Sequence, residues 1–325
     1  MELGTAEQPG GNSAVTFGDV LSAAETIRPF VHRTPVIRCE SLNELAQASL
    51  HFKCENLQKV GAFKFRGACN AVFRLSDADA QKGVVTHSSG NHAQALALAA
   101  RKREIQAHIV MPSNAPKVKR DAVIGYGANV IECAPNLEAR ESTAEKVKRE
   151  TGATFIHPYD HPHVIAGQGT AALELLEETG RLESIIAPVG GGGLISGTCL
   201  AVSGHPARVE VFAAEPLGAD DAARSKAANR RIPQQSPNTI ADGLLTSLGE
   251  LTWPFVRDNV QEVITVTEAE IIEAMKLFWT RTKCLIEPSS ATAVAVALQA
   301  RWPPGSEVGI ILSGGNVDLE NLPWT

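Results

Sequence analysis

Short apolar runs alternate with longer amphipathic runs along most of this chain. The apolar runs are rich in β-branched residues and fit buried strands, whereas the longer runs repeat their apolar positions with helical spacing. The predicted strands are residues 84–86, 107–110, 129–131, 154–156, 185–189, 209–213, 263–266 and 308–312. The clearest predicted helices are residues 91–102, 115–124, 137–150, 164–178, 268–280 and 289–300. Such alternation predicts an α/β fold of parallel sheets with crossover helices.

The alternation runs in two series, so we expect two α/β lobes. The smaller lobe is predicted to span residues 76–156, and the larger one residues 1–75 and 157–325. Residues 1–13 are rich in Gly, Glu and polar residues, and we expect a loose tail there.

Composition and charge narrow the class of function. The chain has 325 residues, of which 44% are hydrophobic and 20% charged, as in soluble globular proteins. Its net charge of −6 argues against nucleic acid or an anionic membrane as the main partner. The six cysteines form no C-x-x-C pair, and no run approaches the roughly 18 apolar residues of a membrane span. We therefore expect a cytoplasmic protein that acts on a small molecule.

Lys64 lies where a strand around Leu50 and Phe52 leads into a helix predicted for residues 66–75. Aromatic residues flank it on both sides, so its amine is expected to be partly desolvated, which lowers its pKa. A free amine of this kind serves as a nucleophile and base in Schiff-base chemistry. From this stretch alone, an ordinary surface lysine beside a helix start is the favoured interpretation, and the further motifs below reverse it.

A polar motif follows the strand at residues 84–86. Ser88, Ser89, Gly90, Asn91 and His92 open an alanine-rich helix. Backbone N–H groups and the positive end of the helix dipole would bind a carboxylate or a phosphate there. The alternative is that one of the serines is an ordinary N-cap.

Four successive glycines, Gly190, Gly191, Gly192 and Gly193, separate a buried strand from the residues that follow. Such a run has a high cost in chain entropy unless the backbone must approach something closely, and a phosphate is the usual reason. The spacing does not match the dinucleotide-binding fingerprint.

Two further loops follow predicted strands. Ser313 stands at the carboxyl end of the last strand, where α/β sheets place ligand contacts, although Ser-Gly-Gly is also common in turns. Glu215 and Asp221 follow the strand at residues 209–213 and could hold a hard cation, or could form a solvated acidic turn.

Taken together, these motifs resemble the serine/threonine dehydratase and serine racemase family of fold-type-II pyridoxal-phosphate enzymes, which includes 3-hydroxyaspartate dehydratases. The likeness runs from about Phe17 to Leu319. The motifs that carry it are Phe63-Lys64-Phe65-Arg66-Gly67-Ala68, Ser88-Ser89-Gly90-Asn91-His92, Gly190-Gly191-Gly192-Gly193, Thr239-Ile240-Ala241-Asp242-Gly243 and Ser313-Gly314-Gly315-Asn316. The resemblance implies two lobes like those of the tryptophan synthase β subunit, with a cofactor-binding large lobe and a mobile small lobe.

The resemblance also implies roles for individual residues toward pyridoxal 5′-phosphate. Lys64 would bind the cofactor covalently, Phe63 would flank its ring, and Asn91 would hydrogen-bond its 3′ oxygen. The glycine run would hold the phosphate, and Ser313 would face the pyridine nitrogen. The remaining implied cofactor contact is Gly243.

For the substrate, the resemblance implies a small β-hydroxy amino acid such as L-serine or L-threonine, converted to a keto acid and ammonia. Lys64 and Ser89 would act as acid and base on opposite faces, which also permits serine racemisation. The residues implied to bind the substrate are Ser88, Ser89, Gly90, Asn91, His92, Arg140 and Thr246. Mg²⁺, or Ca²⁺ or Mn²⁺, would bind Glu215, Asp221 and the carbonyl of Ala219, and a homodimer is expected.

The cues for substrate choice conflict. Ser89 resembles the residue found in racemases and 3-hydroxyaspartate dehydratases, and Arg140 would suit a larger anionic substrate. Residues 157–160 instead look like threonine and hydroxyaspartate dehydratases. A dedicated 3-hydroxyaspartate dehydratase therefore stays open as an alternative, and so does a non-catalytic carrier of pyridoxal phosphate.

Overall fold

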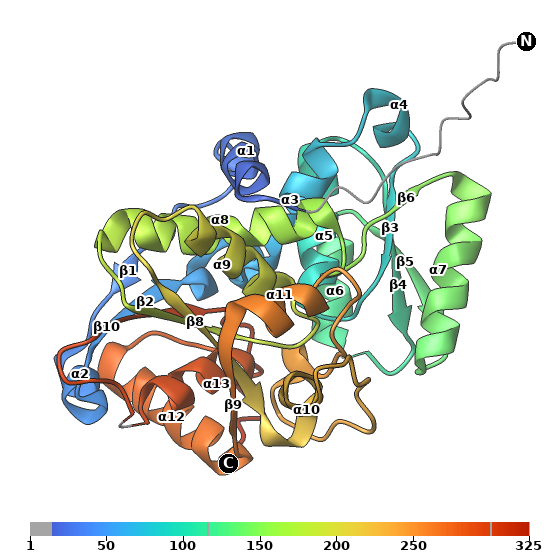
Figure 1. Ribbon diagram of the computed structural model, residues 1–325. Coiled ribbons are helices and arrows are strands. Elements are labelled where there is room, and N and C mark those ends of the chain that lie inside the picture. Colours follow the sequence, from blue (N-terminus) through green and yellow to red (C-terminus); the bar gives the residue numbers. More distant parts are fainter. Residues whose placement is uncertain (1–14, 116, 300, 325) are drawn as a thin grey trace, which may run out of the picture.

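The computed structural model describes residues 15–115, 117–299 and 301–324, so the predicted tail at residues 1–13 lies outside the described part. The larger of two sheets has six strands (Figure 1). Their order across the sheet is β1 (Val36–Ile37), β2 (Ser49–Cys54), β10 (Glu307–Leu312), β7 (Ser184–Pro188), β8 (Glu210–Pro216) and β9 (Val260–Val266). Every neighbouring pair is parallel except β1 and β2, which are antiparallel.

The second sheet has four strands, all parallel. Their order is β5 (Asn129–Cys133), β4 (Ala107–Pro112), β3 (Val84–His87) and β6 (Thr154–Phe155). Each predicted strand is present within a few residues of its expected position, which confirms the α/β class. The strand β1 was missed because two residues in an extended segment carry no periodic signal.

Helices cover both faces of the large sheet, and the apolar side chains between the layers form its core. One face carries α2 (Glu40–Ala46), α12 (Glu268–Thr282) and α13 (Pro288–Ala297). The other carries α8 (Pro162–Thr179), α9 (Gly193–Ser203), α10 (Asp221–Ala228) and α11 (Trp253–Asn259). Outside α8 and α9 lies α1 (Phe17–Ile27).

The small sheet is covered in the same way. One face packs on α3 (Lys64–Phe73), α5 (Asn91–Lys102) and α6 (Lys117–Gly125), and the other on α7 (Leu137–Thr151). A single turn, α4 (Asp77–Ala80), precedes β3. Because α3 also contacts α8, it joins the two layered units.

Helix ends follow the local sequence. Thr16 and Thr267 each form a capping box with the acidic residue three positions later, at the starts of α1 and α12. The helix α7 ends at Gly152, whose φ of 73° is left-handed and favours glycine. In contrast, α3 begins at Lys64, two residues before the predicted start, because Phe63 already has helical backbone angles.

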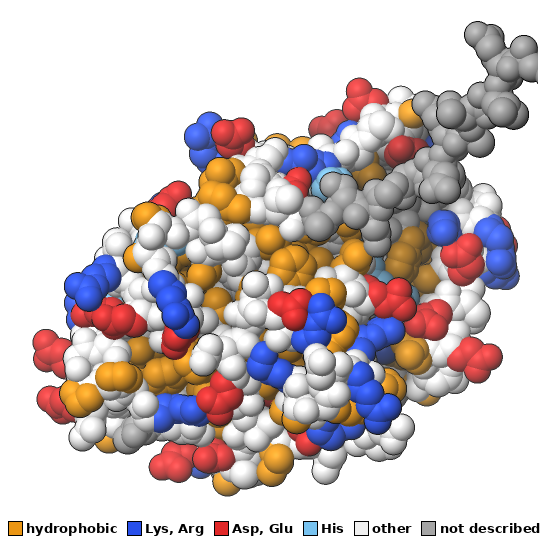
Figure 2. Space-filling model, in the orientation of Figure 1, with side chains coloured by type: hydrophobic (Ala, Val, Ile, Leu, Met, Phe, Trp, Pro, Cys, Tyr) orange, Lys and Arg blue, Asp and Glu red, His pale blue; other side chains and the backbone are white. Residues whose placement is uncertain are grey.

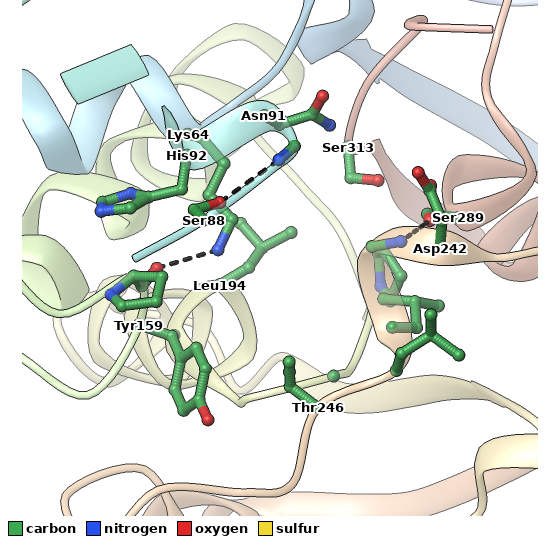
Figure 3. A pocket seen from close by; sticks show the side chains of 18 of the residues that line it. Lys64, Ser88, Asn91, His92, Tyr159, Leu194, Asp242, Thr246, Ser289 and Ser313 are labelled. Carbon is green, nitrogen blue, oxygen red and sulfur yellow. Dashed lines mark hydrogen bonds between the residues drawn. The ribbon is translucent and has the colours of Figure 1, made fainter. Parts of the chain in front are cut away.

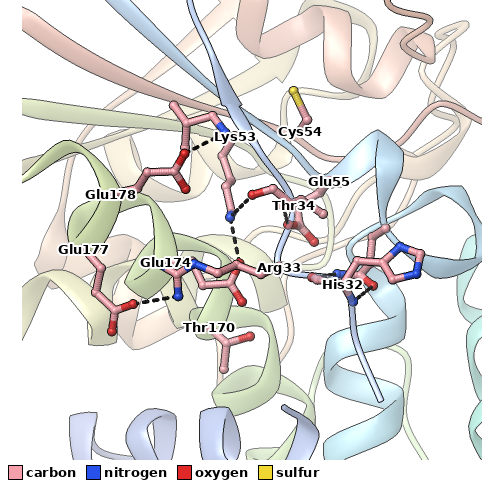
Figure 4. Close-up of polar contacts among 12 residues, drawn as sticks. His32, Arg33, Thr34, Lys53, Cys54, Glu55, Thr170, Glu174, Glu177 and Glu178 are labelled. Carbon is pink, nitrogen blue, oxygen red and sulfur yellow. Dashed lines mark hydrogen bonds and ion pairs between the residues drawn. The ribbon is translucent and has the colours of Figure 1, made fainter. Parts of the chain in front are cut away.

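A buried cluster of charges ties α3 to its neighbours. Arg66 Nε donates to Glu55 Oε2 at 2.7 Å, and Arg66 Nη1 donates to Glu174 Oε1 of α8 at 2.7 Å. Lys53 of β2 pairs with Glu174 Oε2 at 2.7 Å and also donates to the Thr34 carbonyl at 2.6 Å (Figure 4). The charges of Arg66 and Lys53 cancel those of the two glutamates, so the cluster is neutral overall. The side chains of Arg66, Glu55 and Lys53 are fully buried.

None of the helices in the described part of the chain is both long and apolar enough to cross a membrane. On the face drawn in Figure 2, acidic and basic side chains are interspersed rather than gathered into a patch of one sign. Such a surface fits the modest net charge of −6.

The charge cluster generates a stability prediction. Arg66→Met leaves Glu55 buried without its cation, so the free energy of unfolding should fall by about 3–5 kcal/mol. Arg33→Met is the matched control, because Arg33 pairs with Glu177 at 3.0 Å with both side chains about half exposed. The control should lose less than about 1 kcal/mol. Urea unfolding measures both changes, and equal small losses would contradict the structural role of the cluster.

Candidate active site

A cavity of about 460 Å³ lies where the carboxyl ends of strands from both sheets meet. It is bounded by the loops after β3, β7 and β10 and by the start of α3 (Figure 3). The loops thus bring motifs that lie far apart in the sequence to one place, as is typical of α/β sheets. The predicted site residues that line it are Phe63, Lys64, Ser88, Ser89, Gly90, Asn91, His92, Arg140, Gly190, Gly192, Gly193, Gly243, Thr246 and Ser313.

Lys64 is the first residue of α3, and its amine points into the cavity (Figure 3). Nζ donates to the Pro158 carbonyl at 2.9 Å and lies 5.2 Å from the centre of the Phe63 ring. Burial lowers the pKa of the Lys64 amine to about 8, while the negative charge of Glu287 acts in the opposite direction. A sizeable fraction of the amine is therefore unprotonated near neutral pH, as a nucleophile requires.

The start of α5 lacks a side-chain cap. Its N-cap residue is Gly90, and Ser88 Oγ accepts a hydrogen bond from the Gly90 amide at 3.3 Å instead of capping the helix. The alternative that a serine serves as an ordinary N-cap is therefore wrong. Because residues 88–92 line the cavity, the N-terminus of α5 offers N–H groups and a positive dipole end to an anion there.

The glycine run connects β7 to α9, whose N-cap, Gly192, also has no side-chain hydrogen bond. A Cβ on Gly191 would collide with the Tyr159 ring, and a Cβ on Gly192 would lie 2.7 Å from Thr252. Gly192 has a φ of +89°, which also favours glycine. Close packing is thus a second reason for these glycines, and Gly191 lies behind the cavity rather than among the residues that line it.

Ser313 closes the cavity at the end of β10. It is 3% exposed, and its hydroxyl lies 3.2 Å from the Ser290 hydroxyl of α13. The Ser313 carbonyl accepts a hydrogen bond from the Phe63 amide at 2.9 Å, which links this loop to the residue before Lys64. On the same side of the cavity, the Gly243 amide donates to Ser289 Oγ at 3.0 Å.

Two buried histidines and one arginine line the side of the cavity nearest the small sheet. Burial lowers the pKa of His87 to about 4, with the positive charge of Arg140 acting in the same direction. Burial also lowers the pKa of His92 well below its usual value, so both imidazoles are neutral at physiological pH. Arg140 lines the cavity, although its Nε is buried and has no hydrogen-bond partner.

The three residues predicted to bind a cation do not line the cavity. Glu215 accepts from the Ala222 and Ala223 amides at 2.8 and 2.9 Å, and Asp221 Oδ1 is buried without a partner. Burial raises the pKa of Glu215 to about 8 and that of Asp221 to about 6. Among the described residues, no three His, Cys, Asp or Glu side chains gather as metal ligands.

Sequence reasoning missed several residues that line the cavity: Glu287, Asp242, Lys119, His87, Tyr159 and Ser289. Glu287 could have been found, because an acidic residue directly after the apolar Leu285 and Ile286 is unusual unless it has partners. Lys119 carried no such signal, and Asp242 was noted only as part of the motif at residues 239–243. They form an ion pair of 2.5 Å across the cavity, between α6 and the loop that holds Gly243.

These groups suit a ligand with an aldehyde at one end and an anion at the other. An amine with a lowered pKa faces the cavity, and two helix N-termini without side-chain caps border it. A phosphate at the glycine loop and an aldehyde at Lys64 would satisfy both features.

Comparison with known proteins agrees with this geometry. Residues 27–314 match the family model described as "Pyridoxal-phosphate dependent enzyme". The chain is 52% identical to a beta-hydroxyaspartate dehydratase of Paracoccus denitrificans, over 95% of this chain and 98% of that protein. It is 51% identical to a serine racemase of Dictyostelium discoideum, over 95% of this chain and 97% of that protein. The structure of maize serine racemase superposes with a TM-score of 0.93 at 48% identity, covering 94% of this chain and 95% of that one.

Both the match along most of the chain and the high identity to these relatives lead to one conclusion. This chain is a member of the pyridoxal-phosphate-dependent enzyme family, in the branch whose members include serine racemases and hydroxyaspartate dehydratases.

Proposed function

We propose that this enzyme removes water and then ammonia from small β-hydroxy amino acids such as L-serine and L-threonine, and that it also racemises serine. The observation that carries the proposal is the Lys64 amine, whose pKa is about 8 in a cavity that Ser89 also lines. A base and a hydroxyl in one small cavity provide two groups for moving the α-proton.

The residues around the cavity suit the cofactor. Lys64 would bind its aldehyde, the amides of the glycine run would hold its phosphate, and Asn91 would contact its 3′ oxygen. Phe63 and Gly243 would border the ring, and the neutral hydroxyl of Ser313 would face the ring nitrogen without forcing it to stay protonated. When bound, pyridoxal phosphate takes up the electron pair that remains when the α-proton leaves.

The chain's own groups would then handle the protons. Once the substrate amine displaces Lys64 Nζ from the cofactor aldehyde, the freed Lys64 amine would take the α-proton from one face and return a proton to the β-hydroxyl as it departs. Ser89 Oγ serves as acid or base on the opposite face, which allows inversion. The uncapped start of α5, with Ser88, would hold the substrate carboxylate.

A dedicated 3-hydroxyaspartate dehydratase is the second candidate. One observation favours it: Arg140 lines the cavity, and a guanidinium suits the second carboxylate of a hydroxyaspartate. A panel of both enantiomers of serine, threonine and the 3-hydroxyaspartates, assayed for keto acid and for inversion, separates the two candidates. A non-catalytic carrier would release no keto acid from any of them.

We further propose that Glu215, Asp221 and the Ala219 carbonyl bind Mg²⁺ or a similar cation. The support is the pair of buried carboxylates with raised pKa values and the unpartnered Asp221 Oδ1. We also propose that the enzyme is a homodimer in the cytoplasm. Its small lobe, residues 76–156, would move to close over the substrate.

Lys64→Ala should abolish keto-acid release, because it removes the amine that moves the proton; the expected loss is about 10³-fold or more. Borohydride followed by peptide mapping should label Lys64 in the wild type. Lys59→Ala is the matched control, since Lys59 is a nearby lysine with a pKa lowered by burial that lies outside the cavity lining. Substantial turnover in Lys64→Ala would refute its role.

Ser89→Ala should lower serine racemisation by about 10²-fold or more while dehydration of L-serine changes by less than about tenfold, because only inversion needs an acid or base on the second face. Chiral chromatography and a keto-acid assay measure the two rates. Ser88→Ala, which weakens substrate binding, should lower both rates together. Equal losses in Ser89→Ala would contradict the model of two faces.

The cation proposal predicts a pH-dependent stability. Folding raises the pKa values of Glu215 and Asp221, so the cation-free protein binds more protons folded than unfolded and should lose stability as pH rises from about 5 to 8. Mg²⁺ should raise the melting temperature most at pH 8, and Asp221→Ala should remove that response. Asp258→Asn, at an exposed ion pair, should keep it. A wild type indifferent to Mg²⁺ and chelator refutes the site.

A further inference from the structure

Glu287 is a buried carboxylate with an unusual set of partners. It is the N-cap residue of α13, is only 2% exposed, and lines the cavity. Its two oxygens accept from Asn91 Nδ2 at 3.0 and 3.2 Å, and Oε2 also accepts from the Asn316 amide at 3.1 Å. Asn91 begins α5 beside the small sheet, so this contact crosses from one layered unit to the other.

The contacts fix which way the Asn91 amide faces. Asn91 Oδ1 accepts from Asn316 Nδ2 at 2.9 Å, while Asn91 Nδ2 donates to Glu287. Rotating the amide by 180° would place its oxygen against the Glu287 carboxylate and its NH₂ against the Asn316 NH₂, so both hydrogen bonds would be lost. An amide nitrogen carries two hydrogens, and the one not directed at Glu287 stays available for a ligand in the cavity.

The packing around Glu287 leaves little freedom for it to move. A Cβ on Gly314 would lie 2.6 Å from Glu287 Oε1, so the glycine after Ser313 makes room for this carboxylate. The Glu287 amide donates to the Gly314 carbonyl at 3.0 Å. The carboxylate is therefore held between the loop of Ser313 and the start of α5.

We propose that Glu287 is a positioning residue for the cofactor: it holds the Asn91 amide so that the second N–H of Nδ2 is presented to the bound ring. The inference rests on the proposed cofactor contact of Asn91. When ionised, Glu287 offers an acceptor at both oxygens to the Asn91 NH₂, whereas a protonated carboxyl keeps one acceptor oxygen and gains an O–H donor, which weakens the contact.

Charged groups from several elements shift the pKa of Glu287. Burial raises the pKa of Glu287 to about 7, as does the charge of Asp242, whereas Lys119 and the hydrogen bonds from Asn91 and Asn316 lower it. Lys64 also faces it from α3. The positioning role should accordingly strengthen as pH rises through about 7.

The test is the affinity of the cofactor-free protein for pyridoxal phosphate, measured by absorbance titration. Glu287→Ala should weaken binding by about 10- to 100-fold, because it frees the Asn91 amide. Glu287→Gln, which can still accept from Asn91, should stay within about threefold of wild type. In an Asn91→Ala background, Glu287→Ala should add less than about threefold if the two residues act through one contact.

The pH dependence provides a second readout. Wild-type affinity should fall below pH 7 more steeply than that of Glu287→Gln, whose side chain does not titrate. If Glu287→Ala does not fold, this comparison between wild type and Glu287→Gln still decides the matter. Glu270→Gln, at the capping box of α12, is the control and should match wild type in both readouts.

Full affinity in Glu287→Ala, additive losses with Asn91→Ala, or identical pH profiles for wild type and Glu287→Gln would each overturn the inference. A purely structural role would lower the melting temperature of the variants and leave cofactor affinity unchanged, which also overturns it. A wild type that binds no pyridoxal phosphate would instead refute the proposed function.

Discussion

The position of the Lys64 amine depends on the charge cluster at Arg66. Its guanidinium binds Glu55, beyond the end of β2, and Glu174 of α8, so the start of α3 is held against the large sheet. Lys64 lies two residues earlier, on the first turn of that helix, and its amine enters the cavity from there. The desolvation that lowers the pKa of Lys64 is thus a result of tertiary structure, since an isolated helix would leave the amine in water.

Much of this architecture could be predicted from the sequence, because buried parallel strands and their helices carry strong periodic signals. Helix α5 was predicted at its observed ends, and each predicted strand is present. The motifs after β3, β7 and β10 were expected at one site, and their loops do border one cavity. Parallel strands place their carboxyl ends on one edge of a sheet. Loops that follow such strands and carry ligand-binding residues therefore lie close together.

Other features depend on contacts that no local pattern encodes. The absence of a serine cap on α5 follows from Ser88 turning to the Gly90 amide, which the sequence alone leaves open. The ion pair of Lys119 with Asp242 joins residues far apart in the chain, and the sequence around either residue does not indicate this pairing. Glu287 gains its significance only from Asn91 and Asn316, which approach it from other parts of the fold.

The contact of Tyr159 with the glycine loop has an evolutionary consequence. A side chain at position 191 and the aromatic ring at position 159 compete for the same volume. Residues 159 and 191 therefore cannot change independently, because a larger residue at 191 needs a smaller side chain at 159. Sequence change in this corner of the fold is therefore constrained by the packing between the glycine loop and Tyr159.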